Sequence, residues 1–234
     1  MDYSYLDRNV ARVRASIENA RANSRHGSDV SMVAAVKYAD IDEINYLCDN
    51  LGVTDIGENR VQQLLARYEL LQSLGLEVHF IGHLQTNKVK YIIDKVDMIH
   101  SLDRLSLAEE IDRQAKRAGR TVDVLVEINC AREESKGGLM PEEVEQFCRE
   151  ILRFENINLR GFMTMGRKCE KKSEYLKYFC ETYQLVLDIW QKKLHNIDIP
   201  ILSMGMSDSF EEAIASGSNM VRIGRSMFNK NSVK

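Results

Sequence analysis

The sequence has 234 residues, of which 44% are hydrophobic and 29% charged, a composition usual for a globular protein with one apolar core. Its net charge of −3 gives no basic footprint for nucleic acid or anionic membranes, and its longest strongly apolar stretch, 32–36, is far shorter than the roughly 20 residues that span a bilayer. The five cysteines form no CxxC pair and no secretory signal is visible, so we expect a reduced, cytoplasmic protein with a single domain over residues 1–234.

The first 25 residues predict an amphipathic helix. Apolar residues recur at steps of three and four from Leu6 to Ala20, which places them on one face. Gly27 and Ser28 then end the pattern. We therefore expect a leading helix within residues 1–25.

After this helix, short apolar runs alternate with helical patterns to the end of the chain. The runs lie at 32–36, 53–56, 78–81, 98–100, 122–128, 159–163, 199–202 and 220–223. Helical patterns between them include one over about 85–94 and a short one opened by SDSFEE, where Asp208 and Glu211 fit a capping box. Eight near-equal units favour a parallel (β/α)8 TIM barrel, fold class α/β, over an open doubly wound sheet.

The ligand site of such a barrel lies at the carboxyl ends of the strands. Lys37 directly follows the first run, and water loss at a strand tip would disfavour its ammonium form and make the amine nucleophilic. The alternative is that the aliphatic part of the Lys37 side chain packs on the rim of the barrel while its ammonium group reaches solvent. The other polar residues after predicted strands are Glu58, Asn59, His83, Ser101, Asn129, Thr164, Ser203, Ser207, Arg222 and Gly224.

Two turns near the end of the chain predict a phosphate cradle. The sequence SMGMS carries Ser203 and Ser207, and RIGRS offers the backbone N–H groups of Gly224 and Arg225. Arg222 would direct its guanidinium group, which is always charged and carries several hydrogen-bond donors, to the same end of the barrel. The structural alternatives are that SMGMS only caps a helix and that Arg222 only forms a salt bridge at the rim of the barrel. A strand-end lysine opposite such a cradle indicates a phosphorylated carbonyl held as a Schiff base, either pyridoxal 5′-phosphate (PLP) or a sugar phosphate.

The histidines do not predict a metal site. His79 and His83 are spaced as HxxxH, but the residues between them read as a strand entering a turn, so the two rings would not share a helical face. We expect His83 to line the pocket and His79 to be structural. His100 fits a core position, and Glu127 fits a structural partner in the barrel interior.

At these same residues the chain resembles the pyridoxal phosphate homeostasis protein family. The matching segments are AAVKY, GENRVQ, HFIGHLQTNKVK, IHSLDR, VLVEIN, SKGG, LRGFMTM, LSMGMSDSFEEAI and SNMVRIGRSMF, which together cover almost the whole chain. The resemblance implies a barrel similar to the N-terminal domain of alanine racemase, with PLP bound as an internal aldimine on Lys37 and its pyridine nitrogen facing Arg222. It further implies phosphate ligands at Ser203, Gly224 and the backbone of Arg225, with Ser207 near them, and pocket walls at Asn59, His83, Met163 and Thr164.

Two positions depart from the pattern of that family. Val36 stands where a serine or threonine often precedes the lysine, so a local hydrogen bond is absent. Arg225 stands where a threonine often follows Gly224, so a hydroxyl is lost and a charge is gained. The backbone of Arg225 can still bind phosphate.

The implied function is to hold PLP and act in intracellular vitamin B6 homeostasis, without dedicated catalytic turnover. An arginine at the pyridine nitrogen favours this, because it does not readily leave that nitrogen protonated as an electron sink. We expect a monomer with PLP-dependent apo-enzymes as candidate partners, and neither nucleic acid nor membrane. The alternatives are a racemase-like or decarboxylating PLP enzyme, a Schiff-base aldolase acting on a sugar phosphate, and a purely structural barrel. Only 11 residues follow Ile223, so we expect no room for the second domain of a racemase.

Overall fold

A computed structural model describes residues 2–24, 29–133, 136–166, 169–192 and 200–230. Within these residues the strands pair in parallel and in chain order, and β8 closes onto β1. The strands are β1 (Ser31–Ala35), β2 (Asp55–Glu58), β3 (Glu77–Phe80), β4 (Met98–Leu102), β5 (Val122–Ile128), β6 (Ile157–Thr164), β7 (Ile201–Ser203) and β8 (Met220–Ile223).

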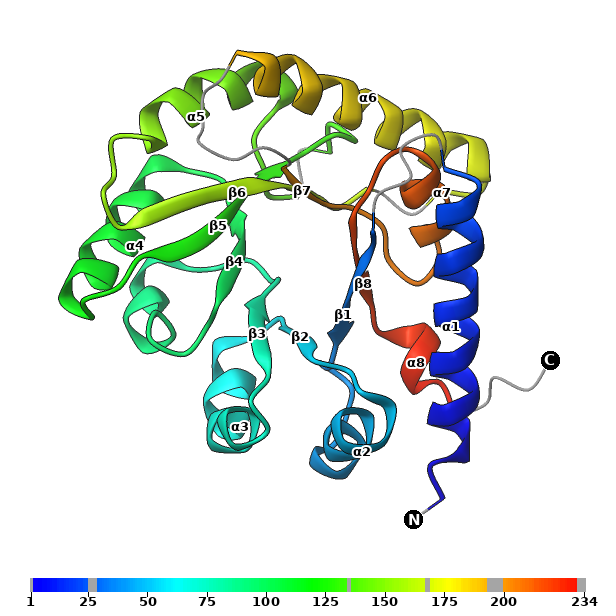
Figure 1. The fold of residues 1–234 in the computed structure, drawn as a ribbon. Helices are drawn as coiled ribbons and strands as arrows, with labels where there is room; N and C mark the ends of the chain where they lie inside the picture. Colours follow the sequence, from blue (N-terminus) through cyan, green and yellow to red (C-terminus); the bar gives the residue numbers. More distant parts are fainter. Residues whose placement is uncertain (1, 25–28, 134–135, 167–168, 193–199, 231–234) are drawn as a thin grey trace.

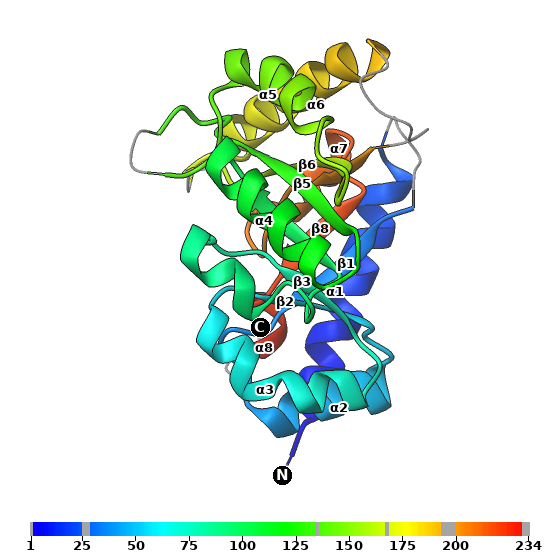
Figure 2. The same ribbon diagram turned by 90° about the vertical axis from the view of Figure 1, so that its left-hand side faces the viewer.

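Helices surround the strands, as Figure 1 shows. They are α1 (Ser4–Ala22), α2 (Ile41–Leu51), α3 (Val61–Ser73), α4 (Leu105–Arg117), α5 (Val144–Ile151), α6 (Lys172–Gln191), α7 (Phe210–Ala215) and α8 (Arg225–Phe228), with 3₁₀ turns η1 (Thr86–Tyr91) and η2 (Pro141–Glu143). The leading helix α1 packs along α7 and α8 on the outside of the barrel (Figures 1 and 2). None of the helices in the described ranges is long and apolar enough to cross a membrane.

The predicted (β/α)8 barrel with an additional N-terminal helix is confirmed. The strands at 122–128 and 220–223 have the predicted bounds, and the others shift by a few residues at their ends. Residue 199 of the predicted run 199–202, and residues 1 and 25 of the predicted leading helix, lie outside the described residues. The single domain over 1–234 stays a prediction.

Two local predictions are wrong. The helix expected over 85–94 is only the 3₁₀ turn η1, whose sequence TNKVKY is rich in weak helix formers. The capping box at Asp208 is absent, because Ser209 is the N-cap of α7 and no side chain caps it. Asp208 instead forms an ion pair with Arg225, which places its carboxylate beside the predicted cradle.

Alternation along the strands separates an outer apolar layer from a partly polar barrel interior. Outward residues such as Phe80, Val124 and Ile223 join the core that the helices cover. Between them, the inward positions hold a small apolar cluster of Met98, Leu125 and Met163. The other buried inward residues include His79, His100, Glu127, Ser203 and Arg222.

Candidate functional site

A hollow of about 400 Å³ opens at the carboxyl ends of β1 and β8 and beside the turns that follow β6 and β7. Five of the predicted site residues line it, namely Lys37, Ser207, Arg222, Gly224 and Arg225. The other lining residues are Ala35, Tyr38, Lys136, Met165, Gly166, Tyr175, Met206, Asp208 and Ser209. The barrel therefore brings together residues almost 190 positions apart in the sequence, as the strand-end rule predicts.

The hollow is strongly basic. Lys37, Lys136, Arg222 and Arg225 line it together with one carboxylate, Asp208, which Arg225 already neutralises. Lys136 also has a carboxylate partner, because its Nζ lies 2.7 Å from Glu133 Oε2. Lys37 and Arg222 therefore supply the cationic charge that no carboxylate contacts in the described residues, and such charge suits an anion such as phosphate.

Lys37 lies two residues after the end of β1 and its side chain is exposed. Its Nζ lies 4.9 Å from the centre of the Tyr38 ring, so the ammonium stacks on an aromatic face at the mouth. The water loss expected from its place at a strand tip does not occur in this structure, and the alternative with the ammonium in solvent describes it better. An amine in this position is accessible to a carbonyl compound that enters the hollow.

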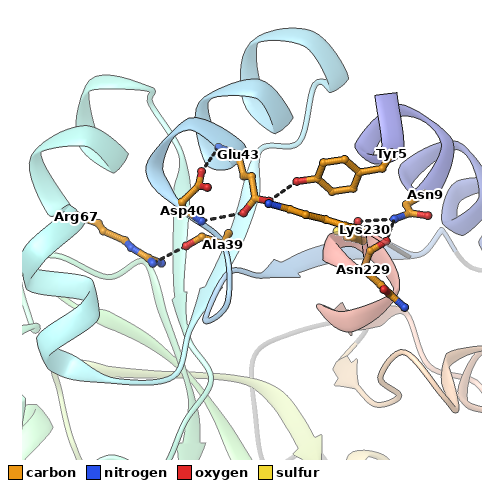
Figure 3. A network of polar contacts seen from close by, with 9 residues as sticks. Tyr5, Asn9, Ala39, Asp40, Glu43, Arg67, Asn229 and Lys230 are labelled. Atoms are coloured by element: carbon orange, nitrogen blue, oxygen red, sulfur yellow. Dashed lines mark hydrogen bonds and ion pairs between the residues drawn. The ribbon is translucent and has the colours of Figure 1, made fainter. Parts of the chain in front are cut away.

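The backbone on both sides of Lys37 is fixed by Arg67 of α3. Its Nη1 donates to the carbonyl oxygen of Val36 at 3.0 Å and to Glu58 Oε1 at 3.1 Å. Its Nη2 donates to the carbonyl oxygen of Ala39 at 2.6 Å (Figure 3). Glu58 is fully buried, and this burial raises its pKa while Arg67 opposes the rise. Arg67 thus holds the lysine-bearing segment and neutralises a buried carboxyl.

A second set of contacts fixes the same segment where it enters α2. Asp40 and Glu43 form a reciprocal capping box, with hydrogen bonds of 2.8 and 2.9 Å between side chain and backbone. Glu43 also accepts from the hydroxyl of Tyr5 in α1 and lies 3.1 Å from Lys230 Nζ (Figure 3). The position of Lys37 is therefore linked to both ends of the described chain.

Arg222 reaches the hollow from the barrel interior and is only 5% exposed. Its Nη1 donates to the carbonyl oxygen and to the Oγ of Ser203, both at 2.6 Å, and its Nη2 donates to the carbonyl oxygen of Thr164 at 2.9 Å. Burial lowers the pKa of Arg222 to about 10, and the nearby Glu127 opposes this. The guanidinium is still charged at neutral pH, and β6 and β7 fix its orientation.

The two predicted turns contact each other as a cradle requires. The backbone N–H of Ser226 donates to Ser207 Oγ at 3.1 Å, and its hydroxyl contacts the carbonyl oxygen of Ser207 at 3.4 Å. A Cβ on Gly224 would lie 3.0 Å from the carbonyl oxygen of Ala35, so this position has no room for a side chain unless β1 moves. Gly224 therefore keeps backbone close to β1 at the floor of the hollow.

The other predicted site residues lie elsewhere. Asn59 and His83 line a separate hollow of about 260 Å³ with Gln85 and Lys88. Met163 packs inside the barrel, and Thr164 Oγ1 bonds to the carbonyl oxygen of Ile128 at 2.7 Å, so only the carbonyl of Thr164 reaches Arg222. Ser203 is fully buried beneath Arg222. The contact roles of these five residues stay predictions.

Sequence reasoning missed Arg67, Lys136 and Tyr38. A signal for Arg67 exists, because it lies on the same helical face as the buried Leu64 and Leu71, where a charged residue needs a partner. The described residues hold no group of three or more histidine, cysteine, aspartate or glutamate side chains placed to bind a metal ion.

Comparison with known proteins identifies relatives of this chain over almost its whole length. The family model of the alanine racemase N-terminal domain matches residues 6–232. The pyridoxal phosphate homeostasis protein of Aquifex aeolicus is 39% identical over 219 residues, which cover 94% of this chain and 95% of that relative.

Solved structures with the same fold include two similar chains. A protein of unknown function from Bifidobacterium adolescentis is 34% identical, with a TM-score of 0.89 and 97% of each chain covered. PipY from Synechococcus elongatus, solved with PLP bound, is 25% identical, with a TM-score of 0.80 over 95% of this chain and 99% of that one.

Proposed function

The chain belongs to the pyridoxal phosphate homeostasis protein family, and from this premise we propose that it holds PLP in the hollow beside Lys37 and acts in PLP homeostasis. The curated relatives are named for homeostasis, which describes binding and regulation rather than turnover of a dedicated substrate. The structure of PipY with PLP bound supports the choice of cofactor.

The observation that carries the proposal is the meeting of Lys37, Arg222 and Gly224 in one basic hollow. These residues fit PLP, because its aldehyde requires a primary amine, its phosphate requires cations and close backbone, and its ring requires apolar walls such as Met206 and Tyr38. The hollow is also within the usual size range of small-molecule sites, about 300–1,000 Å³. A phosphate ester carries a charge of about −1.5 to −2 at pH 7, which matches the excess of cations.

Each part of PLP has a proposed ligand. Lys37 would hold the cofactor through Nζ, because a primary amine can condense with the aldehyde carbon and release one water molecule. Ser207, Gly224 and Arg225 surround the phosphate. Ser203, which the resemblance implies as a further phosphate ligand, is buried and holds Arg222 in place on the side of the pyridine nitrogen. Asn59, His83, Met163 and Thr164 are retained as candidates for outer walls.

Arg222 determines how strongly PLP could act as a catalyst. PLP supplies an electron-withdrawing ring when bound, and protonation of the pyridine nitrogen strengthens that withdrawal. The guanidinium of Arg222 only donates hydrogen bonds, and three of these already go to Ser203 and Thr164. Because Arg222 cannot accept a hydrogen bond from a protonated pyridine nitrogen, it favours simple binding of PLP over carbanion chemistry.

Arg225 gives this chain its own version of the cradle. Its side chain pairs with Asp208 across the two turns. The positive charge that Arg225 brings to this position, where the family often has a threonine, is therefore partly neutralised.

The exposure of Lys37 suits a monomeric carrier that exchanges PLP with apo-enzymes in the cytoplasm.

Borohydride reduction tests the proposed covalent bond. The protein incubated with PLP and reduced should carry one stable adduct on the peptide that contains Lys37, as read by mass spectrometry. Trapping only in the presence of a sugar phosphate would support an aldolase instead. Absence of any adduct on Lys37 would contradict the covalent part of the proposal.

A further inference from the structure

A line of hydrogen-bonded side chains joins Arg222 to the opposite end of the barrel. Ser203 Oγ lies 2.6 Å from Arg222 Nη1 and 3.2 Å from His100 Nδ1. His100 Nε2 lies 2.9 Å from His79 Nδ1, and His79 Nε2 lies 3.3 Å from Asp55 Oδ1. The five residues come from β8, β7, β4, β3 and β2, so the line crosses the barrel interior.

Only one end of this line reaches water outside the candidate site. His100 and Ser203 are fully buried and His79 is 4% exposed. The Asp55 side chain is 28% exposed at the start of β2, where it lines a hollow of about 380 Å³. The other end is Arg222, which lines the hollow with Lys37.

For a neutral His79, the acceptor at one end of the line sets the direction of the protons. The carboxylate of Asp55 only accepts, so His79 carries its proton on Nε2 and donates it to Asp55. His79 Nδ1 is then an acceptor, so His100 carries its proton on Nε2 and accepts at Nδ1 from the hydroxyl of Ser203. Ser203 Oγ in turn accepts from Arg222, which only donates. Both rings are then neutral Nε2–H tautomers.

The charges agree with this order. Burial lowers the pKa of His100 well below its usual value, and the positive charge of Arg222 acts in the same direction. The hydrogen bond from His79 lowers the pKa of Asp55, which keeps its carboxylate as the final acceptor. A cation and an anion thus terminate a neutral line, and each bond polarises the next.

We propose that His79, His100 and Asp55 are positioning residues for the candidate cofactor site. They keep the hydroxyl proton of Ser203 turned away from Arg222, so that a lone pair of Ser203 Oγ always faces Nη1 and fixes the guanidinium at the wall of the hollow. This inference rests on the proposed function only where its readout uses PLP.

The first test needs no cofactor. Nitrogen NMR of the labelled protein at pH 8 should show both His79 and His100 as Nε2–H tautomers, and His100 should stay neutral down to pH 6. The Nη protons of Arg222 should be resolved and slow to exchange. A proton on Nδ1 of either ring, or freely rotating Arg222 Nη groups, would overturn the proposal whether or not PLP binds.

The second test uses variants with PLP as the probe. His100→Leu leaves the Ser203 hydroxyl without its acceptor, so we expect PLP affinity to fall about fivefold or more and the absorption band of bound PLP to shift. His100→Gln keeps one hydrogen-bond acceptor and one donor, so it should restore most of the PLP affinity and most of the band position. Equal affinity and an unshifted band in His100→Leu would overturn the proposal, whereas a parent that binds no PLP would contradict the proposed function and leave the NMR test intact.

Asp55→Asn has a matched control at the same end of the barrel. Asp97 precedes β4, and its Oδ2 accepts from the backbone N–H of Val78 at 2.7 Å without joining the line. Asp55→Asn should shift the band and loosen Arg222, and Asp97→Asn should reduce only thermal stability. A band shift of equal size in both variants would assign the effect to general loss of structure.

Discussion

Arg67 Nη2 donates to the carbonyl oxygen of Ala39 at 2.6 Å, which ties a residue of helix α3 to the segment that carries Lys37. Nη1 of the same side chain holds Val36 on the other side of that lysine at 3.0 Å. The amine at the mouth of the hollow is exposed, but the backbone that presents it is held from both sides. The hollow thus combines a reachable nucleophile with a fixed attachment point.

Replacement of Arg67 by methionine should lower both stability and PLP affinity. The variant leaves the fully buried Glu58 without its cation, and loss of one partner of a buried ion pair destabilises a protein by about 3–5 kcal/mol. Urea denaturation gives the free energy of unfolding, and titration with PLP gives the affinity.

The double variant Arg67→Met/Glu58→Gln separates the two roles of Arg67. It removes the unpaired charge, so it should recover much of the stability lost in Arg67→Met. PLP affinity should stay low, because Val36 and Ala39 still lack their donor. Recovery of both quantities together would contradict a role of Arg67 in holding the lysine segment.

Gly224→Ala should weaken the floor of the hollow. Its Cβ would lie 3.0 Å from the carbonyl oxygen and 3.3 Å from the Cβ of Ala35, so β1 or the turn has to shift. Overpacking of this kind destabilises by about 1–3 kcal/mol, and the shift should also reduce PLP binding. Gly166→Ala is the control, because its Cβ would meet nothing within 4 Å and should leave the melting temperature unchanged. Equal melting temperatures for Gly224→Ala and the parent would contradict this close contact.

Glu127 should make stability depend on pH. Burial, together with Asp103, raises the pKa of Glu127 to about 7, while Arg222 opposes the rise. The folded protein therefore keeps this proton to higher pH than the unfolded chain. The stabilisation is fully present below pH 4.5, the ordinary value for glutamate, and is lost as pH rises through 7.

The variant Glu127→Gln has no such proton to lose. Between pH 4.5 and 8 its free energy of unfolding should therefore improve relative to the parent by about 2–3 kcal/mol, as measured by urea denaturation at each pH. Parallel pH profiles for the two proteins would show that the pKa of Glu127 is not raised by folding.

The sequence predicted most of the barrel and five residues of the hollow, because strand ends meet in a known place once alternation identifies the strands. The bounds of β5 and β8 were predictable, since their apolar runs end at polar residues or turns. The 3₁₀ turn η1 was not predictable, because its short apolar pattern fits an α-helix as well as it fits a 3₁₀ turn. The interior position of Glu127 is confirmed, as is the core position of His100.

The contacts that hold the site could not be predicted in the same way. His79 meets His100 only because β3 and β4 are neighbours in the closed barrel, and His100 meets Ser203 across its interior. Arg67 has a periodicity signal, but its acceptors are backbone carbonyls, which no residue type reveals. Packing across the closed barrel, rather than local sequence, selects these partners.

The visible absorption spectrum of the purified protein with PLP, beside that of Lys37→Ala, tests the central claim most directly. Lys95→Ala serves as the control, because Lys95 pairs with Asp94 away from the hollow. The parent and Lys95→Ala should show the yellow Schiff-base band, and Lys37→Ala should lack it. A parent that stays colourless with PLP, or a band that persists in Lys37→Ala, would contradict the assignment of Lys37 as the anchor of the cofactor.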